Sequence, residues 1–143
     1  MQDKNVMEKI RSSAGFLLID KNRKFILQHR DEKIKRFPGY WAFFGGKMEA
    51  RETPEKCVRR EAKEELGIKL EDLKFIKSYK SKQREEEQFI FIVSLKIPLE
   101  KLKKQQKEGQ DLGLFSYREI KKIKIPSFEK SILKNLFRKN LIA

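Results

Sequence analysis

The stretch from Gly45 to Ile68 constrains the fold more than any other, because it predicts a glycine turn followed by a short acidic helix. The pair Gly45-Gly46 marks a place where the backbone needs a positive φ or a close approach by another group. Thr53 suits an N-cap, Pro54 the first helical position and Gly67 the C-cap. These signals predict a helix of roughly 13 residues between the caps.

The two faces of this helix differ in character. At about 100° per residue, Val58, Ala62 and Leu66 form an apolar stripe that should face a core. Three carboxylates lie beside that stripe: Glu61, Glu64 and Glu65. Like charges at these spacings destabilise a helix, unless a hard cation such as Mg²⁺ or Mn²⁺ sits among them. The alternative interpretation of such a run is a solvated acidic face.

The spacing of the whole stretch favours the cation site. Gly46 is followed after five residues by Glu52 and, after seven more, by the run REAKEELGI that ends at Ile68. This pattern resembles in full the Nudix box, G-x5-E-x7-R-E-U-x-E-E-x-G-U, in which U is a bulky aliphatic and Ala62 is the one small occupant. The chain therefore resembles the MutT-like Nudix hydrolases. The resemblance implies an α/β fold, namely the Nudix α/β/α sandwich with a mixed curved sheet and a catalytic loop-helix-loop.

Length and composition are consistent with one such domain over residues 1–143. The chain has 143 residues, 38% of them hydrophobic, with 11 phenylalanines, which predicts a packed globule. The single cysteine, Cys57, excludes an internal disulfide, suits a reducing compartment and is interpreted as structural. Because neither a membrane span nor a signal peptide is apparent, the expected location is cytoplasmic.

The chain carries a formal net charge of +14, which favours polyanionic partners such as nucleotides, RNA or phosphate-rich surfaces. The lysines are spread along the chain and form no single block. A lysine-rich surface that follows a biased genome composition is the alternative explanation.

Periodicity and turn residues predict the flanking elements. The first ten residues are expected to form a short helix or a loose arm. A capping box at 116–119 begins a short helix, and a last amphipathic helix begins at Pro126-Ser127. The expected strands cover residues 12–19, 24–30, 73–81, 88–97, 99–107 and 112–116.

The resemblance implies a metal site for Mg²⁺, with Mn²⁺ as a possible substitute. Its ligands are the Gly45 carbonyl and four carboxylates, those of Glu61, Glu64, Glu65 and Glu108. Glu108 stands in an E-G-Q loop before a short strand, where MutT-like enzymes complete the metal site from outside the helix. The alternative donors are Glu85, Glu86 and Glu87 in the charged hairpin turn. Either Glu61 or Glu108 orients or deprotonates the attacking water.

The resemblance also assigns a phosphate contact to Arg30. Lys47, next to the glycines, is expected to bind phosphate as well, and Trp41 is expected to stack on a base. A surface arginine and a core tryptophan are the alternative interpretations. Arg60 is grouped with the catalytic residues; it is expected on the side of the helix opposite the metal face, where it forms a structural ion pair with Glu52.

The Nudix box implies cleavage of a diphosphate bond and leaves the leaving group open. Gln83 and the residues 84–86 replace the markers of ADP-ribose and dinucleoside polyphosphate enzymes, and no base-reading asparagine appears at 125–129. The favoured function is a nucleoside triphosphate pyrophosphatase that gives a nucleoside monophosphate and pyrophosphate. The alternatives are an RNA 5′-end pyrophosphohydrolase and a Nudix-fold binding module without turnover. The expected state is a monomer or a homodimer.

Overall fold

The computed structural model describes residues 11–83 and 85–143, so the expectation for residues 1–10 lies outside the described residues. Three α-helices and a short 3-10 helix are described: α2 (Pro54–Leu66), α3 (Leu99–Gln105), η1 (Glu119–Lys122) and α4 (Ser127–Arg138). The strands are β1 (Arg11–Ile19), β2 (Phe25–His29), β3 (Trp41–Ala42), β4 (Phe44–Lys47), β5 (Leu73–Ser81), β6 (Glu86–Ser94) and β7 (Asp111–Phe115).

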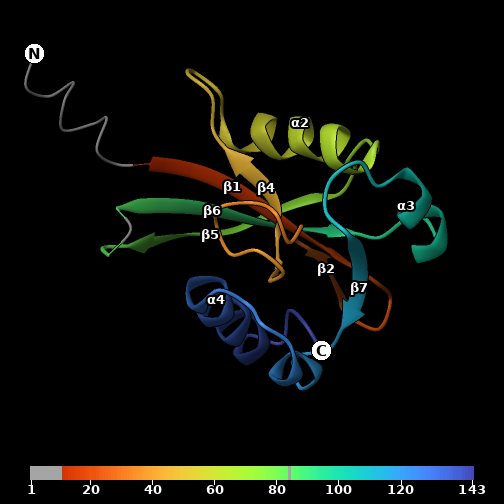
Figure 1. Ribbon diagram of the computed structural model, residues 1–143. Helices are drawn as coiled ribbons and strands as arrows, with labels where there is room; N and C mark the ends of the chain where they lie inside the picture. The colour runs from red at the N-terminus through yellow and green to blue at the C-terminus, as the bar shows by residue number, and fades with distance from the viewer. Residues whose placement is uncertain (1–10, 84) are drawn as a thin grey trace, which may run out of the picture.

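These strands form one mixed sheet of seven strands, with the order β3-β2-β1-β6-β5 along its main path (Figure 1). β1 lies at its centre and pairs in parallel with β6 over the whole length of both strands. On its other side β1 pairs with β4 through its first half and with β2 at its end, both antiparallel. β7 pairs with β2. The sheet is therefore split at this edge, where β4 and β2 diverge from β1.

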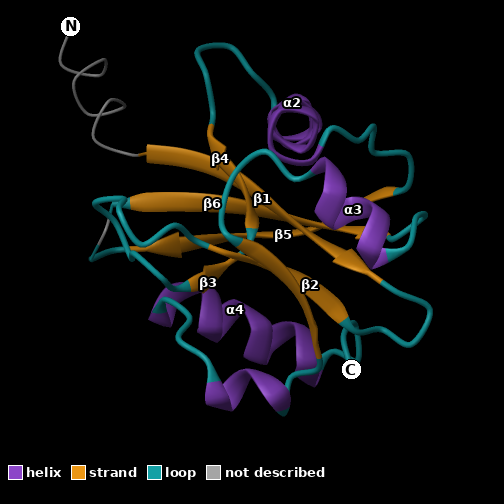
Figure 2. Ribbon diagram, turned by 45° about the vertical axis from the view of Figure 1, so that its right-hand side comes forward, coloured by secondary structure: helices purple, strands orange, loops and turns teal. Residues whose placement is uncertain are grey.

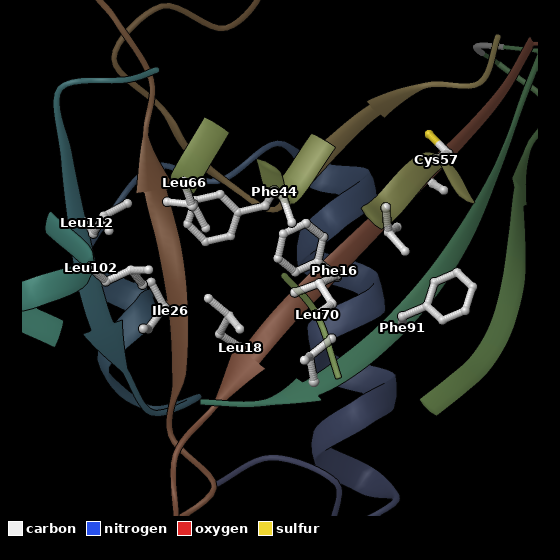
Figure 3. Packing of buried hydrophobic residues seen from close by; sticks show 14 residues of the cluster. Phe16, Leu18, Ile26, Phe44, Cys57, Leu66, Leu70, Phe91, Leu102 and Leu112 are labelled. Carbon is white, nitrogen blue, oxygen red and sulfur yellow. The ribbon is translucent and has the colours of Figure 1, made fainter. Parts of the chain in front are cut away.

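Helices cover both faces of the sheet: α2 and α3 lie on one side and α4 on the other (Figure 2). Alternate residues of β1 serve the two layers, because successive side chains of a strand point to opposite faces. Phe16 and Leu18 pack in the core under α2, whereas Leu17 packs in the core over α4. Figure 3 shows the α2 core, in which Phe44 and Leu66 lie next to one another. The predicted α/β/α sandwich with a mixed sheet is confirmed.

Helix α2 has the caps that the sequence predicts. Its 13 residues follow Thr53, whose hydroxyl accepts the Lys56 N–H at 3.2 Å. It ends at Gly67, which has a left-handed φ of 65° and donates its N–H to the Lys63 carbonyl at 3.0 Å. A residue with a side chain would be strained at this φ. Both ends of the helix are thus fixed by local chemistry.

The strand expected at residues 99–107 is wrong, because this segment forms helix α3. Pro98 precedes it with an extended backbone, at φ −61° and ψ 147°. All seven residues of LEKLKKQ are strong helix formers, and their spacing buries Leu102 in the α2 core. The apolar spacing of three, and not the alternation of a strand, determines the structure here.

Strand β5 ends the main path of the sheet and carries three exposed lysines, Lys74, Lys77 and Lys80. Lysines on an edge strand oppose pairing with the strands of another chain. Phe75, between the first two, is 51% exposed and packs against Phe91, with ring centroids 5.3 Å apart. Among the described residues no helix has the length and apolar character that a membrane crossing requires.

Candidate active site

The two glycines of β4 bring this strand into close contact with its neighbours. Gly46 pairs with Ala14 and faces α2: a Cβ placed on it would overlap the Glu61 carboxylate and lie 2.7 Å from its Cδ. Gly45 has a φ of 132°, and a Cβ there would lie 2.6 Å from the Gly15 Cα. The side chains missing at 45 and 46 therefore make room for β1 on one side and for a helix carboxylate on the other.

Glu65 is the most enclosed carboxylate of α2, with 3% of the residue exposed. Its Oε2 accepts the Gly45 N–H at 3.1 Å, which ties the helix to the glycine strand. Burial raises the pKa of Glu65 to about 9, and the charges of Glu61 and Glu108 add to this shift. Without a cation nearby, this carboxyl group therefore keeps its proton at neutral pH.

Glu61 and Glu64 lie beside it and share a partner. Arg60 donates to Glu61 Oε1 at 2.9 Å and to Glu64 Oε2 at 3.3 Å. Burial raises the pKa of Glu61, and the neighbouring charges of Glu64 and Glu108 act in the same direction. The α2 edge, which is the side of the helix that carries Glu61, Glu64 and Glu65, therefore gathers several carboxylates in a partly buried environment.

Glu108 approaches this edge from the loop between α3 and β7. That loop is bound to the end of α2, because the Lys107 N–H donates to the Glu65 carbonyl at 2.7 Å and the Gln105 side chain donates to the Leu66 carbonyl at 3.2 Å. The charge of Glu108 acts on both Glu61 and Glu65. The structure therefore brings Glu108 to the carboxylates of α2.

The hairpin acids, the alternative donors, have other partners. Glu86 accepts from the Arg36 guanidinium at 3.3 Å, and Glu87 accepts from the Ser78 hydroxyl at 3.0 Å. Glu85 is an exposed turn residue with a φ of 51°. None of the three is among the described groups whose charge raises the pKa of Glu61 or of Glu65.

The expected ion pair between Arg60 and Glu52 is present. Its two hydrogen bonds measure 2.7 Å and 2.9 Å, and this bidentate contact lowers the pKa of Glu52 to about 2. The expectation that Arg60 lies opposite the metal face is wrong, because the same guanidinium also contacts Glu61 and Glu64. A long arginine side chain bends around the helix, so the position of its Cα does not fix where its charge lies.

Cys57 lies beneath the glycine strand and is fully buried. Its Sγ lies 3.5 Å from the Gly46 carbonyl oxygen. Burial raises the pKa of this thiol to about 12, so it stays protonated and is a poor nucleophile. This environment supports the structural interpretation of the residue.

The donor set of this edge fits a hard divalent cation. Carboxylate and main-chain carbonyl oxygens are the ligands that such ions prefer, and added positive charge would lower the pKa values of Glu61 and Glu65. No three acidic, histidine or cysteine side chains of the described residues already form a metal cluster. Arg60 supplies positive charge to Glu61 and Glu64 instead. The residues that could hold a metal are the five of the sequence prediction, namely Gly45, Glu61, Glu64, Glu65 and Glu108.

A pocket of about 280 Å³ adjoins the glycine strand. It contains two of the three predicted substrate contacts, Arg30 and Lys47, and the Arg30 guanidinium is held by the Arg36 carbonyl at 2.9 Å. Trp41 does not line this pocket: its ring stacks on His29 at 4.4 Å and meets Phe115 edge-on at 5.0 Å. The lining consists of Ser12, Ser13, Arg30, Arg36, Phe37, Ala42, Phe43, Phe44, Gly45, Gly46, Lys47, Glu86, Gln88, Pro126 and Glu129.

Strand β4 separates the pocket from the carboxylates. Directly paired residues of neighbouring strands point to the same face, so Gly46 faces α2 with Ala14, whereas Lys47 faces the pocket with Ser13. In the described sheet β4 pairs with β1 alone, and its Gly45 N–H donates to Glu65 of α2. The pocket and the acidic helix therefore lie on the two faces of this glycine strand.

Several lining residues are absent from the sequence prediction. Ser13 and Gln88 lie in segments that the sequence identifies only as strands, and their register across β1 and β6 brings them together. Arg36 and Phe37 belong to a loop without periodicity. One signal in the sequence could have identified Ser13 and Gln88. Each is a polar residue at the start of an apolar strand, on the face that the alternation of side chains directs towards α4.

The fold and the site together define an α/β sandwich in which strand β4 lies between a capped acidic helix and a pocket. The family model described as "NUDIX domain" matches residues 9–136. The chain therefore belongs to the Nudix family.

Two curated relatives and one solved structure illustrate the similarity. An 8-oxo-dGTP diphosphatase of Proteus vulgaris is 40% identical over 68 residues, which cover 48% of this chain and 56% of the relative. The nucleoside triphosphatase NudI of Enterobacter sp. (strain 638) is 44% identical over 54 residues, which cover 38% of each chain. The chain thus spans about half or less of the length of these relatives. A MutT protein of Methanosarcina mazei Go1 has a TM-score of 0.72 at 19% identity, over 92% of this chain and 95% of that one.

Proposed function

We propose that this Nudix hydrolase is a Mg²⁺-dependent nucleoside triphosphate pyrophosphatase that releases a nucleoside monophosphate and pyrophosphate. The observation that carries the proposal is the glycine strand β4, which has a pocket on one face and the carboxylates of α2 on the other. The names of the two curated relatives, a diphosphatase and a triphosphatase of nucleotides, support the same substrate class.

In this proposal the residues divide the work between binding and proton transfer. Glu61, Glu64, Glu65, Glu108 and the Gly45 carbonyl would hold the cation. When bound, the cation would neutralise the charge that develops on the bridging oxygens and lower the pKa of a water molecule. Arg30 and Lys47 bind the phosphates from the pocket side. Glu61 or Glu108 orients the water for in-line attack on phosphorus and accepts its proton.

Arg60 acts as a positioning residue in this scheme. Its bidentate bond to Glu52 fixes the loop before α2, and its contacts with Glu61 and Glu64 orient two carboxylates when the cation is absent. A cation that binds these carboxylates would displace Arg60 from them while the Glu52 pair stays intact.

An assay of hydrolysis over nucleoside triphosphates, nucleoside diphosphate derivatives and triphosphorylated RNA, with and without Mg²⁺, tests the proposal. We expect Mg²⁺-dependent release of pyrophosphate from triphosphates, and its loss in Glu64→Gln and Glu65→Gln. Glu55→Gln is the matched control, since this carboxylate lies on the same helix and pairs with Arg59 at 3.0 Å, away from the pocket. Full activity in both site variants would contradict the assignment.

The net charge of +14 gives a specific reason to include RNA as the second candidate substrate. Preferential cleavage of 5′-triphosphorylated RNA, with a steep loss on addition of salt, would favour this alternative. Nucleotide binding without turnover on any of these substrates would identify the third candidate, a binding module.

A further inference from the structure

We propose that Gln88 is a specificity-determining residue, whose carboxamide reads the hydrogen-bonding edge of the nucleobase. This inference rests on the proposed function, because the base belongs to the nucleotide that is hydrolysed. Gln88 lies on β6, two strands away from the glycine strand, and lines the pocket.

A polar row crosses four strands of the sheet at this level. Lys47 pairs with Ser13, Ser13 with Gln88, and Gln88 with Tyr79, so all four side chains point to the α4 face. The row ends on α4, where the Tyr79 hydroxyl donates to Asn135 at 2.6 Å. Three members of the row line the pocket, and Tyr79 anchors its far end to the helix.

Within this row the Gln88 carboxamide has room and an open hydrogen-bonding capacity. A Cβ on Gly15 would lie 2.9 Å from Gln88 Nε2, so the absence of a side chain at Gly15 provides the space that the amide occupies. The amide makes no side-chain hydrogen bond to any residue of the described part of the chain. An amide that is half-buried on the floor of a pocket gains a partner when a polar ligand group enters.

The position along the row matches the base end of a nucleotide. Lys47 stands at the glycine strand, where the phosphates pass, and Gln88 lies two strand spacings away, about 10 Å. This separation is of the order of the distance between the phosphates of a nucleotide and its base. Apolar surfaces of Phe43 and Pro126 line the same pocket and suit the faces of a base.

The chemistry of the amide gives the inference a direction. A carboxamide donates through Nε2 and accepts through Oε1, so it can pair with keto bases and with amino bases. A carboxylate in its place only accepts, so it loses contacts in which the amide donates to a ring nitrogen or a keto oxygen and keeps contacts in which it accepts from an amino group or a ring N–H. Gln88→Glu should therefore disfavour a base that the amide contacts as a donor and change the order of preference among the four bases.

The test compares kcat/KM of the full chain for ATP, CTP, GTP and UTP at fixed Mg²⁺. In Gln88→Glu we expect the ratio of kcat/KM between the base that the wild type prefers and at least one other base to change at least about tenfold, because one donor is replaced by an acceptor. Gln88→Met, which keeps the length and removes both polar atoms, should lower discrimination between bases. Gln83→Glu, in the exposed turn, makes the same change of charge outside the pocket and should leave the ratio unaltered.

Binding of AMP, CMP, GMP and UMP without metal, followed by NMR titration, separates this inference from the proposed function. A base preference that Gln88→Glu redirects supports the inference even if no triphosphate is hydrolysed. An equal loss of affinity for all four bases in both variants would show a structural role and overturn the inference. Unchanged preferences in folded Gln88→Glu and Gln88→Met, with folding verified by circular dichroism, would overturn it as well.

Discussion

A carboxylate that is enclosed, as Glu65 is, lowers the stability of the fold that contains it. The residue is 3% exposed and its charged form is opposed by Glu61 and Glu108, while the Gly45 N–H offers one compensating hydrogen bond. Such an arrangement is typical of a functional site, where a carboxyl group is kept protonated at a cost in stability until a ligand compensates for its charge.

We expect Glu65→Gln to stabilise the metal-free protein at neutral pH by on the order of 2 kcal/mol, while it abolishes hydrolysis. The pKa of Glu65 is raised from 4.5 to about 9 on folding, so the contribution of this group to the stability of the metal-free protein is fully present below about pH 4.5 and is lost as the pH rises towards 9. Denaturant unfolding with EDTA between pH 5 and 9 measures this slope. The slope should become shallower in Glu65→Gln, where the raised pKa of Glu61 still contributes.

Glu64→Gln serves as the comparison for this experiment. The Glu64 side chain is 53% exposed, so Glu64→Gln should leave the stability at pH 7 nearly unchanged even though hydrolysis is lost. A slope that is the same in wild type and Glu65→Gln would show that Glu65 is ionised and stabilised by other means.

The ion pair between Arg60 and Glu52 should give the opposite pH dependence of stability. The guanidinium lowers the pKa of Glu52 from 4.5 to about 2, so the stabilisation is present above about pH 4.5 and is lost as the pH falls towards 2. Glu52→Gln should cost about 2 kcal/mol at pH 7 and nearly nothing near pH 2. Unfolding curves of both proteins from pH 7 to pH 2 should converge; parallel curves would contradict the assignment.

At the level of single residues, the sequence predicts whatever follows from spacing. The carboxylates of α2 and the pairing of Arg60 with Glu52 follow from one motif. The second set of contacts made by Arg60 does not, because a flexible side chain chooses among neighbours that only the fold brings near. Gln88 gains its place from the register between β1 and β6, which a single strand cannot reveal.

At the level of elements, the strand β4 lies between the pocket and the acidic helix. A side chain is excluded at each of its two glycines for a different reason. Gly46 meets the end of a side chain, that of Glu61, whereas Gly45 has a φ of 132° and meets the backbone of Ala14 and Gly15. A side chain can move aside, and a neighbouring strand cannot.

We therefore expect Gly46→Ala to fold and to lose activity, because Glu61 must leave its position. Gly45→Ala should lower stability by several kcal/mol or prevent folding, since an added Cβ would force β4 away from β1. Thermal unfolding and the hydrolysis assay, run on both variants, measure the contrast. Equal stability of the two variants would show that β4 is not held as tightly as the structure indicates.

Elements whose ends are marked by capping residues were predictable from the sequence, and elements without such residues were not. Thr53, Pro54 and Gly67 fix both ends of α2, and the predicted length of the helix agrees with the structure. Residues 99–107 carry two leucines and several lysines after a proline, a pattern that fits a short strand or a short helix. Burial of Leu102 against the α2 core decides for the helix, and this contact is tertiary.

On the scale of the whole molecule, the net charge of +14 predicts attraction of anionic substrates over a distance. We expect kcat/KM for a nucleoside triphosphate to fall moderately between 50 and 300 mM KCl, values chosen to span the usual range of screening. For triphosphorylated RNA the fall should be much steeper, because many phosphates release counterions together. The same salt series with a neutral osmolyte of equal osmolarity is the control.

The position of β4 also has a consequence for what happens after cleavage. If the phosphate chain lies over a strand edge, its two fragments come to rest on opposite faces of the sheet, the monophosphate beside Lys47 and Ser13, and the pyrophosphate beside α2. Each fragment then has its own route to solvent. Departure of one need not wait for the other, so added monophosphate and added pyrophosphate should inhibit turnover independently and occupy the enzyme at the same time.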